Sequence, residues 1–174
     1  MEEQVVLVDE KDNEIGLGEK MQIHEEGKLH RAFSVFVFNS KGQLMMQKRA
    51  ENKYHGGGLW SNTCCSHPRL NEPVEAAAAR RLKEEMGFDC DLKKLYWFIY
   101  KTDVSNGLIE HELDHVFVGK FDSQPKVNPE EVGEWKWVSL DELEKDMEAN
   151  PHNYTFWFRK IMERVGFDIN KLLA

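Results

Sequence analysis

A helix with clearly marked ends lies near the middle of the sequence and separates two groups of strand-like segments. Pro73 stands at its first turn, four alanines follow from Ala76, and Gly87 comes directly after Met86. Proline suits the first turn of a helix, because its missing N–H leaves no hydrogen bond unmade there. Glycine suits the left-handed position after the last turn. The pattern therefore predicts a helix over Pro73–Met86.

Most of the remaining sequence has the composition of β-strands. Segments rich in β-branched and aromatic residues predict strands or short extended pieces at Gln4–Val8, Ala32–Phe38, Leu44–Arg49, Trp60–Cys65, Leu95–Lys101, Glu110–Lys120 and Glu134–Val138. The turn residues Asn39–Gly42 predict a hairpin between the second and third of these. Two further helices are expected at Leu140–Ala149 and Thr155–Val165. Strands outnumber helices, which predicts an α/β (α+β) fold, a mixed β-sheet sandwiched between α-helices, rather than a doubly wound parallel sheet.

Length, charge and cysteine content narrow the class of protein. A chain of 174 residues is expected to form one domain over residues 1–174. The net charge of −8 argues against a nucleic-acid partner. We expect no membrane span and no secretory signal, because no apolar run approaches the ~18–20 residues that cross a bilayer and the N-terminus lacks a basic region. Three cysteines, two of them adjacent, form no disulfide pattern, so we expect free thiols in the reducing cytoplasm.

The predicted central helix carries charges of both signs on one face. Arg81, Glu84 and Glu85 are three or four positions apart, so they lie within one turn of each other. A basic and an acidic group on one face could hold a phosphate and a divalent cation together. A solvated face with ion pairs explains the same spacing equally well.

Two glutamates and three histidines form a second group of candidates. Glu110 and Glu112 alternate along a predicted strand and so point to the same face, where like charges repel unless a cation lies between them. An exposed, wetted strand edge is the alternative. His24, His30 and His67 are individually most typical of surface or packing residues. Combined with the two carboxylates, they would make an N/O site for a divalent metal.

The adjacent cysteines are expected to have different environments. In an extended segment Cys64 and Cys65 point to opposite faces, so at most one faces a pocket. His67 is two positions beyond Cys65 and therefore on the same face, which favours Cys65 as the functional thiol. Cys64 and Cys90 are interpreted as small packing residues.

Four basic residues and two aromatic residues complete the candidate set. The basic residues are dispersed along the sequence, and each alone is an ordinary surface residue: Lys20, Arg49, Lys53 and Arg81. Tyr100 and Trp157 are most simply core or interface aromatics.

Several of these segments together resemble a known family. Leu29–Phe36, Ser61–Pro68, Arg80–Gly87 and Glu110–Glu112 are similar to the corresponding segments of type I isopentenyl-diphosphate isomerases, enzymes built on the Nudix fold. The resemblance covers about residues 4–165, and the Cys-x-His-Pro element combined with Glu-x-Glu is specific to the isomerases. The hydrolase pattern of the same superfamily is incomplete, because Ser66 stands where that pattern has Gly and Arg81 where it has Glu.

The resemblance implies a set of metal ligands and substrate contacts. It implies one divalent metal, Mn²⁺, Zn²⁺ or Mg²⁺, held by His24, His30, His67, Glu110 and Glu112. It implies a second ion, Mg²⁺ on the substrate diphosphate, bound by Glu85. It implies that the diphosphate is contacted by Lys20, Arg49, Lys53 and Arg81.

The resemblance also implies the chemistry. Isopentenyl and dimethylallyl diphosphate would interconvert in isoprenoid biosynthesis by protonation and deprotonation through a carbocation-like intermediate. Cys65 and Glu112 would exchange the protons, with Tyr100 beside Glu112 and Trp157 facing the developing cation. Which of the two donates stays open. The small-molecule substrate needs no nucleic acid or membrane, and the protein is expected to be a cytoplasmic monomer or weak dimer.

An isomerisation of this kind makes demands that these residues meet. Protonating an alkene requires an acid and a base on opposite sides of the substrate, exclusion of water, and an aromatic face for the cation. The diphosphate must be anchored away from the cation by basic residues and Mg²⁺. Two rival functions are a Nudix pyrophosphohydrolase and a metal-binding module without catalysis.

Overall fold

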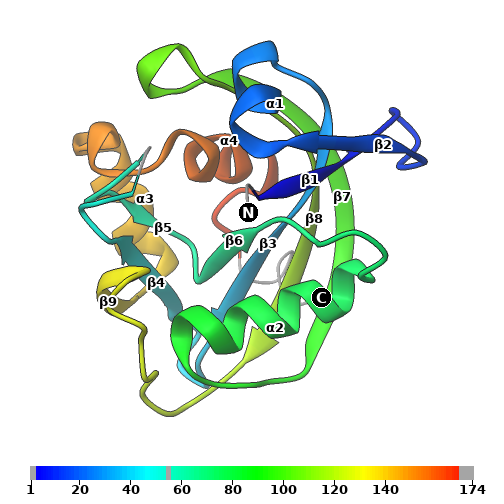
Figure 1. Cartoon of the computed structure of the whole chain (residues 1–174). Helices are drawn as coiled ribbons and strands as arrows, with labels where there is room; N and C mark the ends of the chain where they lie inside the picture. The colour runs from blue at the N-terminus through cyan, green and yellow to red at the C-terminus, as the bar shows by residue number, and fades with distance from the viewer. Residues whose placement is uncertain (1–2, 54–55, 169–174) are drawn as a thin grey trace.

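The computed structural model describes residues 3–53 and 56–168 (Figure 1). The strands are β1 Gln4–Val8, β2 Glu14–Glu19, β3 His30–Phe38, β4 Leu44–Arg49, β5 Trp60–Ser61, β6 Cys64–Ser66, β7 Leu92–Asp103, β8 Ile109–Lys120 and β9 Val132–Val138. The α-helices are α1 Lys20–Glu26, α2 Val74–Met86, α3 Leu140–Ala149 and α4 Phe156–Val165. Short 3₁₀ turns cover Ser105–Gly107 and Pro151–Asn153.

Strand β3 is the centre of a nine-stranded mixed sheet. On one edge it pairs in parallel with β8, with His30 opposite Glu112. On the other edge it pairs antiparallel with β6, where Ser34 lies opposite Cys65. A strand covered on both faces is expected to be apolar along its whole length, and β3 is buried at all but one of its nine positions. The chain therefore brings β6 and β8 to opposite sides of one strand.

Helices cover both faces of the sheet. Phe36 and Phe38 belong to the core that includes α3 and α4. Val35 and Val37 point the other way, into a second core formed with α2, which crosses the lower front of Figure 1. The alternation of β3 side chains between the two cores confirms the prediction of a mixed sheet sandwiched between helices.

The prediction of a hairpin is confirmed at the turn, but it is wrong for the pairing of the two strands beyond the turn. The turn closes between Asn39 and Gln43, and Phe38 lies opposite Leu44. That is the only pair of residues between β3 and β4 in the described part of the sheet. The edges of β3 are taken by β6 and β8, so β4 diverges and pairs instead with β9 and β5.

Strand β2 and helix α1 are absent from the sequence-based prediction. The seven-residue α1 begins after Glu19, whose side chain accepts hydrogen bonds from the N–H groups of Met21 and Gln22. It ends at Gly27, which has φ 66°. A helix this short gives little periodic signal, and two glycines interrupt the strand pattern of β2. The central helix was predicted correctly, except that Pro73 precedes its first turn and α2 begins at Val74.

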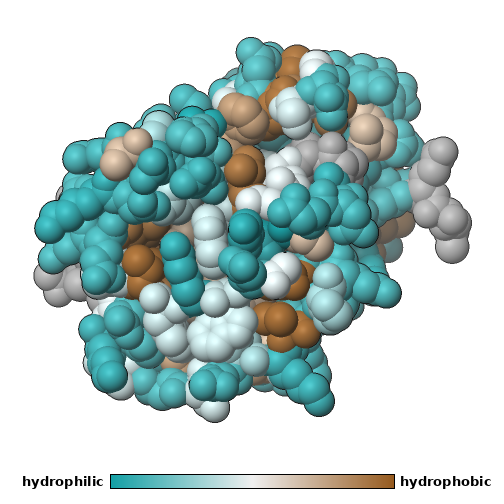
Figure 2. All heavy atoms as spheres, turned by 90° about the vertical axis from the view of Figure 1, so that its left-hand side faces the viewer, coloured by the Kyte–Doolittle hydropathy of each residue, from teal (hydrophilic) through white to brown (hydrophobic). Residues whose placement is uncertain are grey.

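Figure 2 shows one side of the molecular surface, and no large apolar patch is visible on that side. That side is mostly hydrophilic, and its apolar areas are small and separated. Among the described residues, no helix has the length and apolarity that a bilayer crossing requires.

Candidate active site

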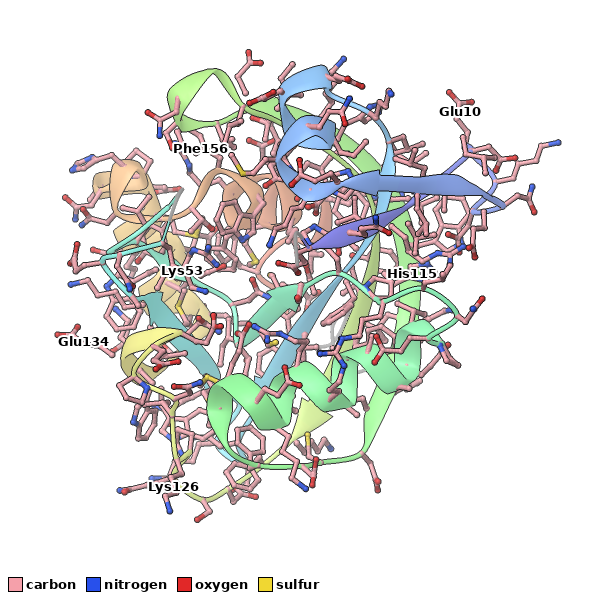
Figure 3. All side chains as sticks on the ribbon, viewed as in Figure 1. Glu10, Lys53, His115, Lys126, Glu134 and Phe156 are labelled. Carbon is pink, nitrogen blue, oxygen red and sulfur yellow. The ribbon has the colours of Figure 1, made fainter. Side chains whose placement is uncertain are left out.

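A cleft of about 300 Å³ collects most of the predicted site residues, although they come from distant parts of the chain. The predicted residues that line it are Lys20, Arg49, Lys53, Cys65, His67, Arg81, Glu85, Glu110, Glu112 and Trp157. His24, His30 and Tyr100 lie behind the lining and contact its two glutamates. In Figure 3 Lys53 lies left of the centre and within the outline of the molecule, whereas Glu10 and Lys126 lie at its edge.

Three imidazoles and one carboxylate form a compact group at one end of the cleft. One ligand atom each from His24, His30, His67 and Glu112 lies within 4.8 Å of all the others. The Glu112 Oε1 atom is 3.2 Å from His67 Nε2 and 3.5 Å from His30 Nε2. Glu110 adjoins the group, because its Oε2 atom is 3.1 Å from His24 Nε2. Three nitrogens and carboxylate oxygens at this spacing suit a divalent metal.

Backbone contacts orient two of the imidazoles. His24 Nδ1 is 2.6 Å from the carbonyl oxygen of Lys20, and His30 Nδ1 is 3.0 Å from that of Lys28. An Nδ1–H that donates to a carbonyl leaves Nε2 available as a ligand, as in most protein metal sites. Within the described residues, buried His30 Nε2 has no hydrogen-bond partner. An unsatisfied buried nitrogen facing two other imidazoles and a carboxylate fits a metal-binding site.

The local electrostatics favour a neutral His67 and an ionised Glu112. Burial lowers the pKa of His67, which favours the neutral imidazole that a metal requires. Burial alone would raise the pKa of Glu112, but the nearby imidazoles of His30 and His67 outweigh it and hold the pKa well below its usual range. Burial and the neighbouring carboxylate raise the pKa of Tyr100, whose hydroxyl donates to Glu112 Oε2 at 2.7 Å. Glu112 is therefore an ionised carboxylate held by a neutral phenol.

The two adjacent cysteines are separated as predicted. Cys64 is fully buried in the core shared with α2, whereas Cys65 lines the cleft. Cys65 Sγ lies 2.9 Å from Asn62 Oδ1 and 3.4 Å from Ser34 Oγ. Burial, and then the nearby carboxyl of Asp114, raise the pKa of Cys65 far above its ordinary value. The resting sulfur is therefore a thiol.

The indole of Trp157 lies at the edge of the cleft beside a cation. Its Nε1–H donates to Ser61 Oγ at 3.2 Å, and the Arg49 guanidinium carbon is 4.9 Å from the ring centroid. A cation at this distance from the ring is attracted by its electron-rich face. The ring therefore makes a cation–π contact at the edge of the cleft.

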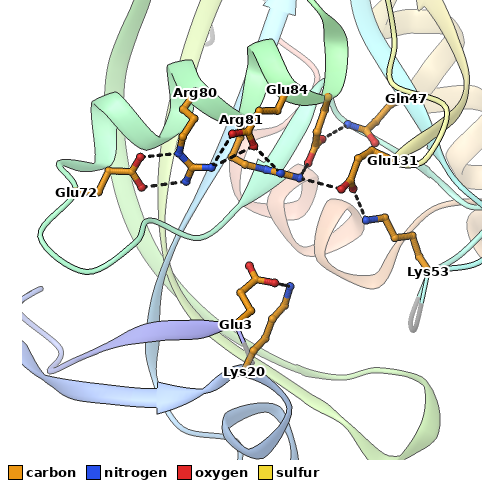
Figure 4. A network of polar contacts seen from close by, with 10 residues as sticks. Glu3, Lys20, Gln47, Lys53, Glu72, Arg80, Arg81, Glu84 and Glu131 are labelled. Atoms are coloured by element: carbon orange, nitrogen blue, oxygen red, sulfur yellow. Dashed lines mark hydrogen bonds and ion pairs between the residues drawn. The ribbon is translucent and has the colours of Figure 1, made fainter. Parts of the chain in front are cut away.

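The basic side chains of the cleft are paired with carboxylates in two separate groups, one with Lys20 and Glu3 and the other with Lys53, Arg81 and Glu131 (Figure 4). Lys20 Nζ is 2.9 Å from Glu3 Oε2, and Lys53 contacts Glu131. Arg81 bridges two acids, at 2.5 Å from Glu85 and 3.6 Å from Glu131. The cleft therefore holds opposite charges side by side.

Helix α2 positions Arg81 and Glu85 on its inner face. Arg81 also donates to Glu84 at 2.7 Å, so the predicted ion pairs along this face are present. Glu85 is buried and accepts a second hydrogen bond from Gln47 Nε2 at 2.8 Å. The face is therefore an ion-paired surface that lines the cleft, and the two interpretations of its spacing are compatible.

Several residues of the site were missed by sequence reasoning. They are Glu131 beside Lys53 and Arg81, Gln47 beside Glu85, and Asn62, Ser34 and Asp114 around Cys65. Extending the alternation of Glu110 and Glu112 by two positions would have found Asp114. Asn62 lies within the Ser61–Pro68 segment but carries no distinctive chemistry of its own. Nothing in the sequence marks the contact of Glu131 with Lys53, because 78 positions separate them.

Solved structures similar to this chain show the same fold. A protein from Deinococcus radiodurans superposes with a TM-score of 0.77 at 20% identity, covering 93% of this chain and 98% of that protein. A MutT protein from Methanosarcina mazei has a TM-score of 0.62 at 22% identity, covering 82% and 94%. At these identities the likeness concerns the fold alone.

Sequence comparisons are more specific. The family model described as NUDIX domain matches residues 28–158. The isopentenyl-diphosphate Delta-isomerase 2 of Aromatoleum aromaticum is 57% identical over 165 residues, which cover 95% of this chain and 87% of the relative. The isopentenyl-diphosphate Delta-isomerase 2 of Photorhabdus laumondii is 54% identical over 167 residues, covering 96% and 94%. The chain therefore belongs to the NUDIX family and, within it, to the isopentenyl-diphosphate Delta-isomerases.

Proposed function

We propose that this protein is the enzyme that interconverts isopentenyl and dimethylallyl diphosphate in isoprenoid biosynthesis. The observation that carries the proposal is one cleft that presents the Cys65 thiol, the Glu112 carboxylate and a set of lysines and arginines. The thiol and the carboxylate serve proton exchange, and the cations serve a diphosphate. Membership of the isomerase family supports the same activity.

The substrate diphosphate would bind to the basic side chains of the cleft. Lys20, Arg49, Lys53 and Arg81 line the cleft and would provide charge-assisted hydrogen bonds. Glu85 is the carboxylate best placed to hold Mg²⁺ on the diphosphate, because it is buried beside Arg81. Anchoring the diphosphate here leaves the five-carbon chain to extend toward Cys65 and Glu112.

The two proton-exchanging groups reach the cleft from opposite sides of β3. Cys65 belongs to β6 and Glu112 to β8, and these strands pair with the two edges of β3. With Cys65 as the acid, the thiol gives its proton to the alkene and becomes a thiolate, and the Glu112 carboxylate takes up the proton that the cation loses. The opposite assignment starts from a Cys65 thiolate and a protonated Glu112, and in both the Tyr100 hydroxyl is hydrogen-bonded to Glu112. Trp157 stabilises the cationic state between the two transfers.

We propose that one divalent ion is held by His24, His30, His67, Glu110 and Glu112. The ion would supply fixed positive charge beside the Glu112 carboxylate. Three nitrogen ligands favour Mn²⁺ or Zn²⁺ over Mg²⁺ in affinity. The protein is further proposed to be a single catalytic domain and a cytoplasmic monomer or weak dimer without a nucleic-acid or membrane partner, and light scattering tests its mass in solution.

Turnover of isopentenyl diphosphate by the metal-loaded protein tests the proposal. Nuclear magnetic resonance in deuterated water should show dimethylallyl diphosphate and deuterium incorporation into both compounds. Cys65→Ser should abolish most of the turnover, because an alcohol exchanges protons far less readily than a thiol. Cys64→Ser is the matched control, and it should affect mainly stability. No isomerisation, together with phosphate release from nucleoside diphosphates, would instead indicate a pyrophosphohydrolase.

A further inference from the structure

The fully buried side chain of Asn62 lies directly behind the cleft thiol, in the link between β5 and β6. Its Nδ2 group donates to the carbonyl oxygen of Val35 at 3.0 Å and to that of Cys64 at 3.1 Å. Both amide hydrogens are therefore engaged by the backbone. Because the two carbonyls can only accept, they also fix which end of the amide faces the thiol.

The end that faces the thiol is the oxygen Oδ1. It accepts from Cys65 Sγ at 2.9 Å and from Ser61 Oγ at 3.0 Å. A carbonyl oxygen has no hydrogen to give, so the thiol is the donor in its contact with Asn62. Ser34 Oγ, the other polar neighbour, lies 2.8 Å from Asp114 Oδ2 and 3.4 Å from the sulfur, a contact in which either atom could be the donor. Of these two neighbours, Asn62 is therefore the one that can only accept from the thiol.

The same network reaches the indole at the edge of the cleft. Ser61 Oγ accepts from Trp157 Nε1 at 3.2 Å and from Thr155 Oγ1 at 3.3 Å. Ser61, Thr155 and Trp157 are all buried. The chain of contacts from Cys65 through Asn62 and Ser61 to Trp157 therefore has little freedom to rearrange.

We propose that Asn62 is a positioning residue of the isomerisation, which orients the Cys65 thiol and ties it, through Ser61, to Trp157. The inference rests on the proposed function. Asn62 is not among the residues lining the cleft, so it acts through Cys65 and not on the substrate. A cysteine side chain has three staggered rotamers, and only a fixed sulfur keeps a reactive geometry with an anchored substrate.

Infrared spectroscopy tests the orientation without reference to activity. The S–H stretch of Cys65 is isolated as the difference between the spectra of the wild-type protein and the Cys65→Ala variant. A hydrogen-bonded thiol absorbs at lower frequency than an unbonded one, so the wild-type band should be shifted down, and Asn62→Ala should return it to the unbonded position. A wild-type band already at the unbonded position would overturn the proposal, even if every Asn62 variant failed to fold.

Thr63→Val is the matched control, since Thr63 is the next residue and is also fully buried. Its Oγ1 donates to the carbonyl oxygen of Met45 at 2.6 Å and accepts from Val37 N at 2.9 Å, away from the thiol. It should lower stability and leave the S–H band in place. Asn62→Ser is a second, milder variant, and it should move the band in the same direction as Asn62→Ala.

Kinetics test the consequence for the reaction. Asn62→Ala should lower kcat by about 10- to 100-fold and change KM by less than about threefold, because the diphosphate contacts are untouched. Thr63→Val should leave both constants close to wild type. An unchanged kcat in Asn62→Ala, with wild-type protein active, would overturn the positioning role. Inactive wild-type protein with the expected band shift would overturn the proposed function instead.

Discussion

The two ends of the cleft differ in which charged groups they bring together. At the His/Glu end, made of His24, His30, His67, Glu110 and Glu112, imidazoles contact carboxylates, and buried His30 Nε2 and His67 Nδ1 have no hydrogen-bond partner among the described contacts. The cationic end is made of Arg49, Lys53 and Arg81, whereas Lys20 lies beside His24. Lys20, Lys53 and Arg81 have carboxylate partners, although buried Arg49 Nε and Arg81 Nε also lack a hydrogen-bond partner among the described contacts. One end therefore gathers possible metal ligands, and the other gathers cations that are partly neutralised by carboxylates.

This difference predicts two kinds of binding. An ion that enters the His/Glu end gains several ligand atoms at once, among them His30 Nε2, so we expect it to bind tightly and persist. A diphosphate that contacts Lys20, Lys53 and Arg81 competes with Glu3 and Glu131, so part of its binding free energy is offset by the ion pairs that it breaks. Such exchange keeps substrate and product, which share the diphosphate, able to leave.

The largest expected effect concerns Glu112, which belongs to the His/Glu end and is also the carboxylate proposed to exchange protons. Glu112→Gln retains the shape and one oxygen but removes the exchangeable carboxylate. Turnover should fall by about 10³-fold or more, while a measurable part of the metal is retained. Steady-state kinetics and metal analysis on the same sample check this. Turnover within tenfold of wild type would mean that this end only binds metal.

A second test removes a ligand from the His/Glu end. His67→Ala should weaken metal affinity by about 100-fold or more, because it deletes one of three imidazoles. His111→Ala is the matched control, since His111 alternates to the opposite face of β8 and contacts the carbonyl oxygen of Gly27. Competition with a fluorescent chelator measures both affinities. Equal affinities in the two variants would remove His67 from the ligand set.

At the cationic end, Arg81→Ala should act on binding. KM for isopentenyl diphosphate should rise by about 10- to 100-fold, because a charge-assisted contact contributes about 1.5–3 kcal/mol. Arg80→Ala is the comparison, because Arg80 is held by two hydrogen bonds to Glu72, at 2.6 and 3.0 Å. Its KM should change less. A larger defect in Arg80→Ala would place the diphosphate nearer to Glu72.

Glu131→Gln tests the competition between carboxylates and the diphosphate, because it removes a carboxylate where Arg81→Ala removes a cation. Removing this charge leaves Lys53 without its carboxylate partner and removes one of the three that Arg81 has, so KM should fall by about two- to fivefold, the scale of a partly exposed ion pair. The neighbouring Glu130 is exposed, and Glu130→Gln should leave KM unchanged. A KM that rises in Glu131→Gln would show that Glu131 assists the diphosphate instead of competing with it.

The smallest expected effect is a difference in pH dependence between the ends of the metal-free protein. Burial alone would lower the pKa of His24, but the contact with Glu110 outweighs burial and raises it. The contact therefore stabilises the fold fully below the ordinary histidine pKa of about 6.5, and this stabilisation is lost as pH rises through the raised pKa. Burial raises the pKa of Glu131, but Lys53 and Arg81 outweigh it and the pKa is lowered. That stabilisation is present above about pH 4.3 and is lost as pH falls through the lowered value.

Thermal melts check this contrast. The wild-type advantage in Tm over Glu110→Gln should shrink as pH rises, whereas the advantage over Glu131→Gln should shrink as pH falls. If both differences in Tm changed in the same direction with pH, the two ends would not differ in their electrostatics.

What could be predicted from the sequence depended on how local each signal was. Leu44–Arg49 and Leu140–Ala149 match the structure at both ends, because composition and flanking turns mark them. The alternation of Glu110 and Glu112 correctly placed both on one face, since period two is a property of any strand. The opposite faces of Cys64 and Cys65 follow from the same rule.

Other parts of the site depend on contacts that no local pattern encodes. Lys20 and His24 lie on α1, a helix too short to be recognised, so their shared helix was not foreseen. The divergence of β4 from β3 depends on competition from β6 and β8, which lie elsewhere in the sequence. The compensating carboxylates Glu3 and Glu131 were missed for the same reason. Resemblance to a family supplied the proposed metal ligands and substrate contacts, but not the carboxylates that neutralise the cations.

The parallel pairing of β3 with β8 also determines when the metal ligands meet as the chain folds. His24 and Glu110 are 86 positions apart in the sequence. Parallel strands this distant must close a long loop, which costs chain entropy, before any stabilising contact between them forms. We therefore expect the His/Glu end to assemble late in folding. If its contacts form after the rate-limiting step, metal bound there should slow unfolding with little effect on the folding rate. The ion would then set the lifetime of the folded enzyme.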